Sequence, residues 1–332
     1  MEEITHRFVE TNGIRMHIAE NGKGVLVILC HGFPELWYTW RHQLVALGEA
    51  GFHGVAPDQR GYGQTDRPEP MEAYHILNLV GDMVGLVKAL GEEKAFIVGH
   101  DWGANVAWHC ALLRPDLFRA VVALSVPFLP RLRGKIPPTE IMKKMSGEKV
   151  FYQVYFQEPG RAEADMEANV RKTMRMTLYS LSGNAPPEKR WHFMLNKSEK
   201  APGTSSMPEA LPSWLMEKDV DYFVSEFQRT GFRGGLNWYR NIDRNWELTS
   251  FLEGTKIYLP ALFVAGEVDP VIKMYQKAFD NLEKNVLQLK GKILISGVGH
   301  WVNQENPVGI NKLILEFLKS LEKGKGDNSI FA

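Results

Sequence analysis

The alternation of short apolar runs with helical stretches constrains the fold of this 332-residue chain more than any other feature. The runs are continuously apolar, which is typical of strands buried on both faces. Buried strands that alternate with helices predict an α/β doubly wound fold, a mostly parallel sheet flanked by helices. The expected strands are Gly24–Cys30, His53–Asp58, Lys94–His100, Arg119–Pro127, Leu259–Pro270 and Gly291–Gly297, and expected helices include Met71–Leu90 and Ala104–Pro115.

The alternation stops after Pro127 and resumes near Leu259. The intervening segment is rich in Met, Lys, Glu and aromatic residues, with helical stretches at Thr139–Gln157 and Asp219–Thr230 and a Pro/Ser/Gly-rich loop at Asn196–Trp214. We therefore expect a helical cap domain inserted into the sheet domain. The expected division is a core of residues 1–128 and 246–332 and a cap of residues 129–245.

Composition narrows the partners and the cellular location. Lys and Arg together number 39, as do Asp and Glu, so the formal net charge is zero and no nucleic-acid partner is expected. The first 24 residues hold no basic and apolar signal segment, and no run is long enough to span a bilayer, so a cytoplasmic protein without membrane contact is expected. A monomer or a homodimer is expected, and the sequence does not distinguish the two. Cys30 and Cys110 lie in apolar segments and are expected to be buried small hydrophobes. Neither metal-ligand spacing nor a glycine-rich phosphate loop is present, so we expect no metal and no cofactor.

The stretch "VGHDWGAN", Val98 to Asn105, has the shape of a nucleophile elbow with an aspartate in place of the usual serine. Asp101 lies between an apolar strand and an apolar helix, with Gly99 and Gly103 two residues to either side. The glycines permit the close backbone approach that a strained strand-to-helix turn requires, and the helix N-terminus favours an anion. Asp101 is therefore the candidate nucleophile. The alternative is an aspartate that only caps the helix.

Two later residues follow strands in the order expected of a catalytic triad. Asp269 comes just past the end of a late strand in "LFVAGEVDPV", and His300 follows the last strand in "ILISGVGHWVNQENP". The order nucleophile, acid, histidine, each at the carboxyl end of a strand, matches a hydrolytic triad. Most of the other histidines, such as His75 and His109 in helical patterns, are expected to be surface or packing residues.

A third element, "CHGFPELWYTW", follows the first strong strand and ends at Trp40. A loop at this place supplies one backbone N–H of an oxyanion hole, which would be that of Phe33, and the residue after the nucleophile, Trp102, supplies the second. Pro34 makes a cis peptide bond accessible after Phe33. The alternative is an ordinary His-Gly turn.

With these motifs in place, the chain resembles a soluble epoxide hydrolase of the α/β-hydrolase superfamily. The resemblance extends over nearly the whole chain, and its fold implies an inserted helical cap. The stretches that carry it are "HGFPE" (His31–Glu35), "DQRGYGQTDRP" (Asp58–Pro68), "VGHDWGA" (Val98–Ala104), "FYQVYFQEPGRAEADM" (Phe151–Met166), "GFRGGLNWYRN" (Gly231–Asn241), "AGEVDPV" (Ala265–Val271) and "GHWVNQENP" (Gly299–Pro307).

Two motifs in the expected cap distinguish this family from dehalogenases with the same aspartate. In epoxide hydrolases one tyrosine opens a Y-x-x-x-F-Q-x-P-G stretch and another ends N-W-Y, positions that Tyr152 and Tyr239 occupy here; Tyr155 does not match. Opening an epoxide leaves an alkoxide, which two phenols can hydrogen-bond and protonate, whereas a halide needs no proton. The alternative for each tyrosine is a core aromatic with its hydroxyl satisfied by a backbone carbonyl.

The resemblance implies a two-step hydrolysis of a small hydrophobic epoxide to a vicinal diol. Asp101 would form a covalent ester, and His300, oriented by Asp269, would activate the water that cleaves it. Residues expected to support the site or bind substrate are His31, Pro34, Glu35, Phe156 and Trp301. Two other functions stay open: a haloalkane-type dehalogenase using the same aspartate, and a non-catalytic ligand-binding protein on this fold.

Overall fold

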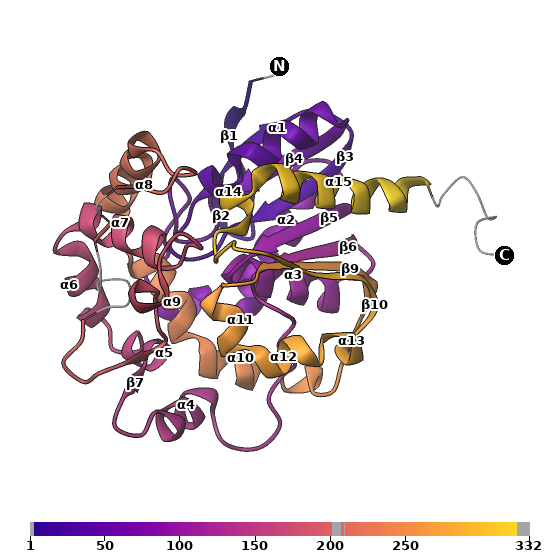
Figure 1. Cartoon of the computed structure of the whole chain (residues 1–332). Coiled ribbons are helices and arrows are strands. Elements are labelled where there is room, and N and C mark those ends of the chain that lie inside the picture. The colour runs from indigo at the N-terminus through magenta and orange to yellow at the C-terminus, as the bar shows by residue number, and fades with distance from the viewer. Residues whose placement is uncertain (1–2, 201–206, 209, 324–332) are drawn as a thin grey trace.

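A computed structural model describes residues 3–200, 207–208 and 210–323 of the chain. Its centre is an eight-stranded sheet with the order β1-β2-β4-β3-β5-β6-β9-β10 (Figure 1). The strands are β1 (Thr5–Thr11), β2 (Ile14–Asn21), β3 (Val25–Cys30), β4 (Phe52–Pro57), β5 (Ala95–His100), β6 (Phe118–Leu124), β9 (Ile257–Gly266) and β10 (Val286–Ile295).

The six predicted strands are confirmed as β3, β4, β5, β6, β9 and β10, and every pair among them is parallel. The expectation that all six are buried on both faces is wrong for β10. This strand lies at the edge of the sheet, and only its first residue, Val286, is fully buried. An edge strand has one neighbour only, so water reaches its side chains.

The sequence reasoning missed the first two strands. β1 and β2 form an antiparallel hairpin, and β2 pairs antiparallel with β4. The outer strand of this hairpin, β1, is mostly polar, and only its Val9 and Thr11 are buried. A strand without a continuous apolar run gives little signal of its own.

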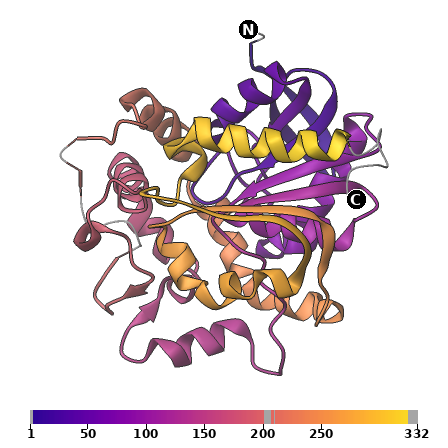
Figure 2. The ribbon, with the colours of Figure 1, turned by 45° about the vertical axis from the view of Figure 1, so that its right-hand side comes forward.

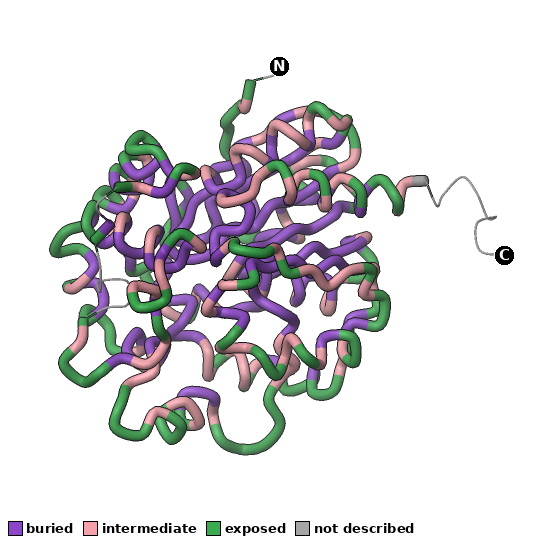
Figure 3. Tube along the Cα trace, in the orientation of Figure 1, coloured by how far each residue is buried: buried purple, intermediate pink, exposed green. Residues whose placement is uncertain are grey.

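Helices cover both faces of the sheet in two layers (Figure 2). On one face, α1 (Arg41–Glu49) packs against α15 (Pro307–Lys323), and on the other, α2 (Ile76–Ala89) packs against α3 (Trp102–Leu113). The predicted helix from residue 71 begins later, because Met71–Tyr74 is a short 3-10 turn. Buried residues follow the central strands and the inner faces of these helices (Figure 3).

Most remaining helices lie in the segment between β6 and β9, here called the inserted segment. It contains α4 (Pro138–Ser146), β7 (Val150–Phe151), α5 (Tyr152–Tyr155), α6 (Arg161–Glu167), α7 (Val170–Ser180), a 3-10 turn (Pro187–Lys189), β8 (Met194–Leu195), α8 (Glu217–Thr230), α9 (Arg233–Arg240), α10 (Ile242–Leu248) and a 3-10 turn (Ser250–Leu252). The predicted helix at 219–230 is confirmed as α8. The stretch Thr139–Gln157 is not one helix, because Gly147 ends α4 and β7 pairs with β8 before α5 begins.

The inserted segment is joined to the sheet domain by buried hydrogen bonds. Trp301 Nε1 donates to the carbonyl of Leu178 at 2.8 Å, and the backbone N–H of His300 donates to the carbonyl of Leu181 at 2.8 Å. The expected boundary at residue 246 falls inside α10, so the division into core and cap stays a prediction. Part of the predicted loop Asn196–Trp214 lies outside the described residues. None of the described helices is both long and apolar enough to cross a bilayer.

Candidate active site

Asp101 lies in the turn between the end of β5 and the start of α3. Its φ of 52° is a conformation that residues with a Cβ rarely adopt. A Cβ on Gly103 would lie 2.0 Å from the carbonyl oxygen of Cys30, and one on Gly99 would lie 2.0 Å from the carbonyl oxygen of Gly103. The strained turn with close backbone approach, predicted from the glycine spacing, is confirmed.

The carboxylate of Asp101 points toward the loop after β3. The backbone N–H of Phe33 donates to Asp101 Oδ1 at 2.9 Å, and the side chain makes no capping hydrogen bond to α3 although Asp101 occupies the N-cap position. Its side chain is 14% exposed. Burial raises the pKa of Asp101, and the charges of His300 and His100 and the N–H groups of Phe33 and Trp102 oppose that rise. The N–H of Phe33 thus donates to the carboxylate, and the N–H of Trp102 adds to the electrostatics that favour its charged form.

Asp269 and His300 meet at the carboxyl ends of β9 and β10. Asp269 is the N-cap of α11 (Pro270–Met274), where its Oδ1 accepts the N–H of Val271 at 2.9 Å. His300 Nδ1 lies 3.2 Å from each oxygen of Asp269. The aspartate is thus fixed by the helix terminus and faces one ring nitrogen of the histidine.

The other ring nitrogen faces the candidate nucleophile. His300 Nε2 lies 3.7 Å from Asp101 Oδ2, so the imidazole bridges the two aspartates. Burial alone would lower the pKa of His300, but the charge and hydrogen bond of Asp269, with the charge of Asp101, outweigh it and raise that pKa to about 9. The protonation of His300 therefore depends on whether both carboxylates are charged.

Tyr152, at the start of α5, and Tyr239, in α9, approach this group from the inserted segment. Their rings contact edge to face with centroids 5.9 Å apart, and the ring of Tyr239 contacts that of Trp102 at 5.2 Å. Gln153 Nε2 donates to the hydroxyl of Tyr152 at 2.8 Å. Burial raises the pKa of both phenols well above its ordinary value, and the charge of Asp101 adds to the rise. Both hydroxyls are held in the protonated form.

A cavity of about 910 Å³ contains Asp101, Trp102 and Tyr152 in its lining. Most of the other lining residues are apolar, which is typical of a pocket for a hydrophobic small molecule. They include Ile76, Leu112, Val126, Phe128, Leu129, Met142, Trp246, Leu252, Val271 and Met274. Among the described residues of this lining, Asp101 is the one carboxylate.

The loop after β3 is held by buried polar contacts. The Phe33–Pro34 peptide bond is cis. Glu35 accepts hydrogen bonds from the N–H of Gly32 at 2.8 Å and the hydroxyl of Thr39 at 2.5 Å, and its Oε2 lies 2.7 Å from His100 Nδ1. Burial would raise the pKa of Glu35, but the charge and hydrogen bond of His100, with the bond from Thr39, hold it near 2. Glu35 therefore fixes the loop as a carboxylate.

His31 also supports this loop. Its Nε2 accepts the N–H of Gln59 at 3.0 Å, so Nδ1 carries the ring proton, which it donates to the carbonyl of Gly32 at 2.9 Å. Burial lowers the pKa of His31, while Asp58 and Glu35 oppose that change.

Phe156 and Trp301 pack around the same centre. Phe156 contacts the rings of Phe33, Tyr152 and Tyr239 at 5.0 to 5.9 Å. Trp301 is fully buried, and its ring lies 4.7 Å from that of His300. All the residues predicted for the site thus lie in or around one constellation.

Sequence reasoning missed four residues that contact the predicted site residues or line the cavity beside them. His100 precedes the candidate nucleophile, and its Nε2 lies 2.8 Å from the carbonyl oxygen of His300. Ser125 follows β6 and contacts both Asp269 and His300. The ends of parallel strands were the available signal for these two. Gln153 and Tyr275 line the cavity and contact each other, and no motif points to either.

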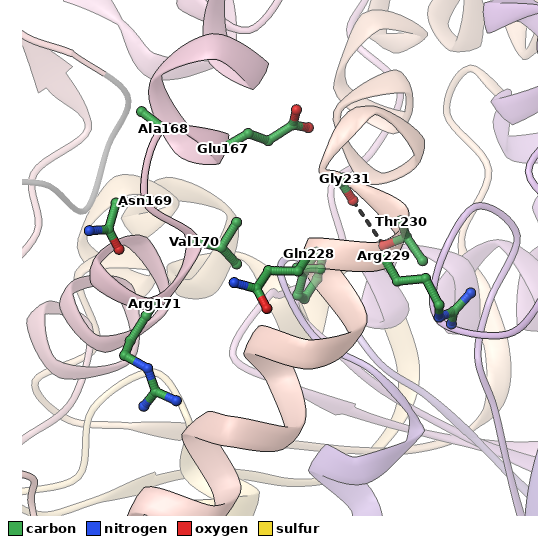
Figure 4. A pocket seen from close by; sticks show the side chains of 10 residues that line it. Glu167, Ala168, Asn169, Val170, Arg171, Gln228, Arg229, Thr230 and Gly231 are labelled. Atoms are coloured by element: carbon green, nitrogen blue, oxygen red, sulfur yellow. Dashed lines mark hydrogen bonds between the residues drawn. The ribbon is translucent and has the colours of Figure 1, made fainter.

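A second, polar pocket of about 600 Å³ lies in the inserted segment, between the start of α7 and the end of α8 (Figure 4). It contains Glu167, Asn169, Arg171 and Arg229, and none of the predicted site residues. Within the described part of the chain, no cluster of three or more His, Cys, Asp or Glu side chains is arranged to hold a metal ion.

Comparison with known proteins agrees with this geometry. Residues 25–307 match the family described as alpha/beta hydrolase fold. The chain is 46% identical over 329 residues to Epoxide hydrolase A of Mycobacterium tuberculosis, with 96% of this chain and 98% of that protein covered. It is 43% identical to Epoxide hydrolase 1 of Siraitia grosvenorii, with 96% and 99% covered.

Solved structures give the same result. An epoxide hydrolase from an endophytic Streptomyces superimposes with a TM-score of 0.92 at 42% identity, covering 97% of both chains. Epoxide Hydrolase A from Mycobacterium thermoresistibile superimposes with a TM-score of 0.89 at 44% identity, covering 96% of this chain and 98% of that one.

Proposed function

The chain belongs to the epoxide hydrolases of the α/β-hydrolase family, and we propose that it converts hydrophobic epoxides to vicinal diols through a covalent ester on Asp101. The observation that carries this mechanism is that the Asp101 carboxylate lies between His300 Nε2, 3.7 Å away, and the Phe33 N–H, 2.9 Å away, at the cavity that Tyr152 lines. One carboxylate is thereby within reach of a base, an oxyanion donor and a hydrophobic ligand.

In the first step, a carboxylate oxygen of Asp101 attacks an epoxide carbon as the ring C–O bond breaks. Tyr152 and Tyr239 donate hydrogen bonds to the ring oxygen and supply the proton that the alkoxide takes. The bond from Gln153 occupies an acceptor position of the Tyr152 hydroxyl, so the phenolic proton is left for the substrate. The high pKa of both phenols keeps that proton in place until charge develops on the oxygen.

Ester formation changes the state of His300. With both carboxylates charged, the pKa of His300 is about 9, and the charge of Asp101 is one of its causes. The ester is neutral, so its formation removes that contribution and lowers the pKa of His300. The histidine therefore becomes a base at the point where the reaction needs one.

In the second step, His300 takes a proton from water, and the hydroxide oxygen attacks the carboxyl carbon of Asp101. The tetrahedral oxyanion is stabilised by the N–H groups of Phe33 and Trp102. Its collapse releases the diol and regenerates the carboxylate. The proton that His300 releases when its pKa falls replaces, through the solvent, the one that a phenol gave to the alkoxide, and the proton that His300 takes from water restores its starting state.

This sequence explains why aspartate replaces serine at the elbow. A serine oxygen that opened an epoxide would form an ether, which an oxyanion hole cannot help to cleave. A carboxylate forms an ester, which the histidine and the two N–H donors can hydrolyse. In this proposal residues 129–245 act as the cap, since they contribute both tyrosines.

A single turnover in water labelled with heavy oxygen tests the proposal. With enzyme in excess over an aryl epoxide, the diol should be unlabelled and the peptide that contains Asp101 should gain one heavy oxygen, because water attacks the ester carbonyl. Label in the diol of the first turnover would mean that water attacks the epoxide directly.

A further inference from the structure

Backbone strain marks a second residue at the site besides Asp101. In the described part of the chain, three residues other than glycine have positive φ: Asn12 (46°), Asp101 (52°) and Ser125 (69°). Asparagine tolerates this region, and a strained nucleophile elbow explains Asp101. Ser125 has no such explanation from its residue type. Strain of this kind persists where the surroundings require it, often at functional sites.

Ser125 is fixed in this conformation by the end of β6. The N–H of Val126 donates to the carbonyl of Leu124 at 2.8 Å, which with the positive φ forms a rare and strained type of γ-turn. The N–H of Ser125 donates to the carbonyl of Val264 in the neighbouring strand at 3.0 Å. The turn directs a fully buried hydroxyl toward the ends of β9 and β10.

The hydroxyl links the acid and the histidine more closely than they approach each other. Ser125 Oγ donates to Asp269 Oδ2 at 2.5 Å and lies 2.9 Å from His300 Nδ1. The direct distances from Nδ1 to the two carboxylate oxygens are both 3.2 Å, at the long end for a hydrogen bond.

The protons available for hydrogen bonds among Ser125, Asp269 and His300 determine which tautomer neutral His300 adopts. An ionised carboxylate only accepts, so the single proton of Ser125 goes to Asp269. The lone pairs of the hydroxyl then remain for Nδ1, which must carry a proton to satisfy them. Neutral His300 is therefore held with Nε2 unprotonated, and Nε2 is the atom that faces Asp101.

We propose that Ser125 is a positioning residue that, with Asp269, holds His300 in the orientation and tautomer required for ester hydrolysis. The inference rests on the proposed function and adds a fourth member to its hydrolytic group. Glycine would satisfy the same turn without strain, because it adopts positive φ freely. The strain at Ser125 is thus retained for its hydroxyl.

Ser125→Gly removes the hydroxyl and relieves the backbone strain of the turn, whereas Ser125→Ala removes the hydroxyl and leaves the strain in place. For both variants, kcat and KM should fall together by roughly tenfold, as expected for the loss of one hydrogen bond at the base, while kcat/KM stays within about twofold. The reason is that ester hydrolysis slows and ester formation does not. Intact-mass measurement after acid quench should show a larger steady-state fraction of ester-bearing enzyme in both variants than in wild type.

A structural role predicts a different pattern. If Ser125 served only the turn, Ser125→Gly would be more stable than wild type and equally active, and Ser125→Ala would lose active protein with KM unchanged. Asn12→Gly is the matched control, since it relieves positive φ in the turn between β1 and β2, outside the group of site residues, and should leave kcat unchanged. Ser125→Cys retains a weak donor and acceptor, and should recover part of kcat if the hydroxyl acts as proposed.

Three results would overturn the inference, and they differ from each other. Wild-type kcat in Ser125→Gly would show that the hydroxyl plays no part in ester hydrolysis, and a fall in kcat/KM as large as that in kcat would show that it acts on ester formation instead. Absence of any ester in wild type and variants alike would remove the proposed mechanism itself, and the role of Ser125 with it.

Discussion

His300 Nε2 lies 3.7 Å from Asp101 Oδ2, so the candidate base and the candidate nucleophile influence each other's charge directly. The charge of Asp101 contributes to a His300 pKa of about 9, and the charge of His300 opposes the rise in the pKa of Asp101. In the proposed mechanism this relationship couples the two half-reactions, because alkylation of the carboxylate would release the histidine to act as a base.

The first prediction concerns this coupling. Asp101→Asn should lower the pKa of His300 below its value of about 9, because a neutral amide no longer stabilises the imidazolium. The pKa can be followed by NMR titration of protein with isotope-labelled histidine. Asp116→Asn, at an exposed carboxylate paired with Arg114, is the control and should leave the pKa of His300 unchanged. An unchanged pKa in Asp101→Asn would contradict the coupling.

The second prediction concerns the two phenols. Tyr152→Phe and Tyr239→Phe should each lower kcat/KM for an aryl epoxide by roughly 10² to 10⁴-fold, because each removes a donor to the ring oxygen, and the double variant should lose nearly all turnover. Tyr155→Phe is the matched control. The hydroxyl of Tyr155 bonds to Asp165 in the inserted segment, so its removal should change kcat/KM less than about threefold. Unchanged turnover in the double variant would exclude the assigned role.

The third prediction follows from the raised pKa of His300. Its pKa is about 9 in the folded chain and 6.5 as the ordinary value, so protonated His300 stabilises the fold below pH 6.5 and this contribution is lost as pH rises to about 9. The difference in unfolding free energy between wild type and His300→Gln should therefore shrink over that range, by about 3 kcal/mol at most. Urea unfolding at a series of pH values measures it. A difference that does not vary with pH would mean that the histidine has no raised pKa.

The fourth prediction concerns the close approach of the loop after β3 to the nucleophile. A Cβ on Gly32 would lie 2.4 Å from Asp101 Oδ1, so Gly32→Ala must displace the carboxylate. We expect a loss of at least roughly 100-fold in kcat/KM with a destabilisation of about 1–3 kcal/mol. Gly54→Ala is a buried control, where the three heavy atoms nearest to the new Cβ belong to leucine side chains at 3.2 to 3.3 Å. Equal activity in both variants would show that the approach is unimportant.

The parallel part of the sheet could be predicted from the sequence because β3, β5 and β6 are continuous apolar runs. Strands that are buried on both faces are apolar at successive positions, which is typical of a parallel sheet. It did not predict β1 and β2, whose stability comes from pairing with each other and with β4 rather than from their own composition. The break at Gly147 was missed for a related reason. Helical periodicity continues across it, and only the pairing of β7 with β8 decides the local structure.

The site residues could be predicted because each one lies in a recognisable motif or at the end of a predicted strand. Asp101, Asp269 and His300 follow the ends of β5, β9 and β10, where the fold brings them to one edge. Ser125 also follows the end of a strand, β6, but its hydroxyl reaches the site through a φ of 69° that its residue type does not predict, so the strand end alone did not single it out. The contact of Gln153 with Tyr275 depends on how the inserted segment packs over the sheet, which no local pattern specifies.

Intact mass of the His300→Gln variant after mixing with an aryl epoxide is the decisive test of the ester on Asp101, because the ester should form and persist when water is not activated. A gain equal to the mass of the whole epoxide is expected, and no gain when Asp101→Asn is added to the same variant. The absence of an adduct with any epoxide, together with an alkyl adduct from a haloalkane, would contradict the proposed mechanism.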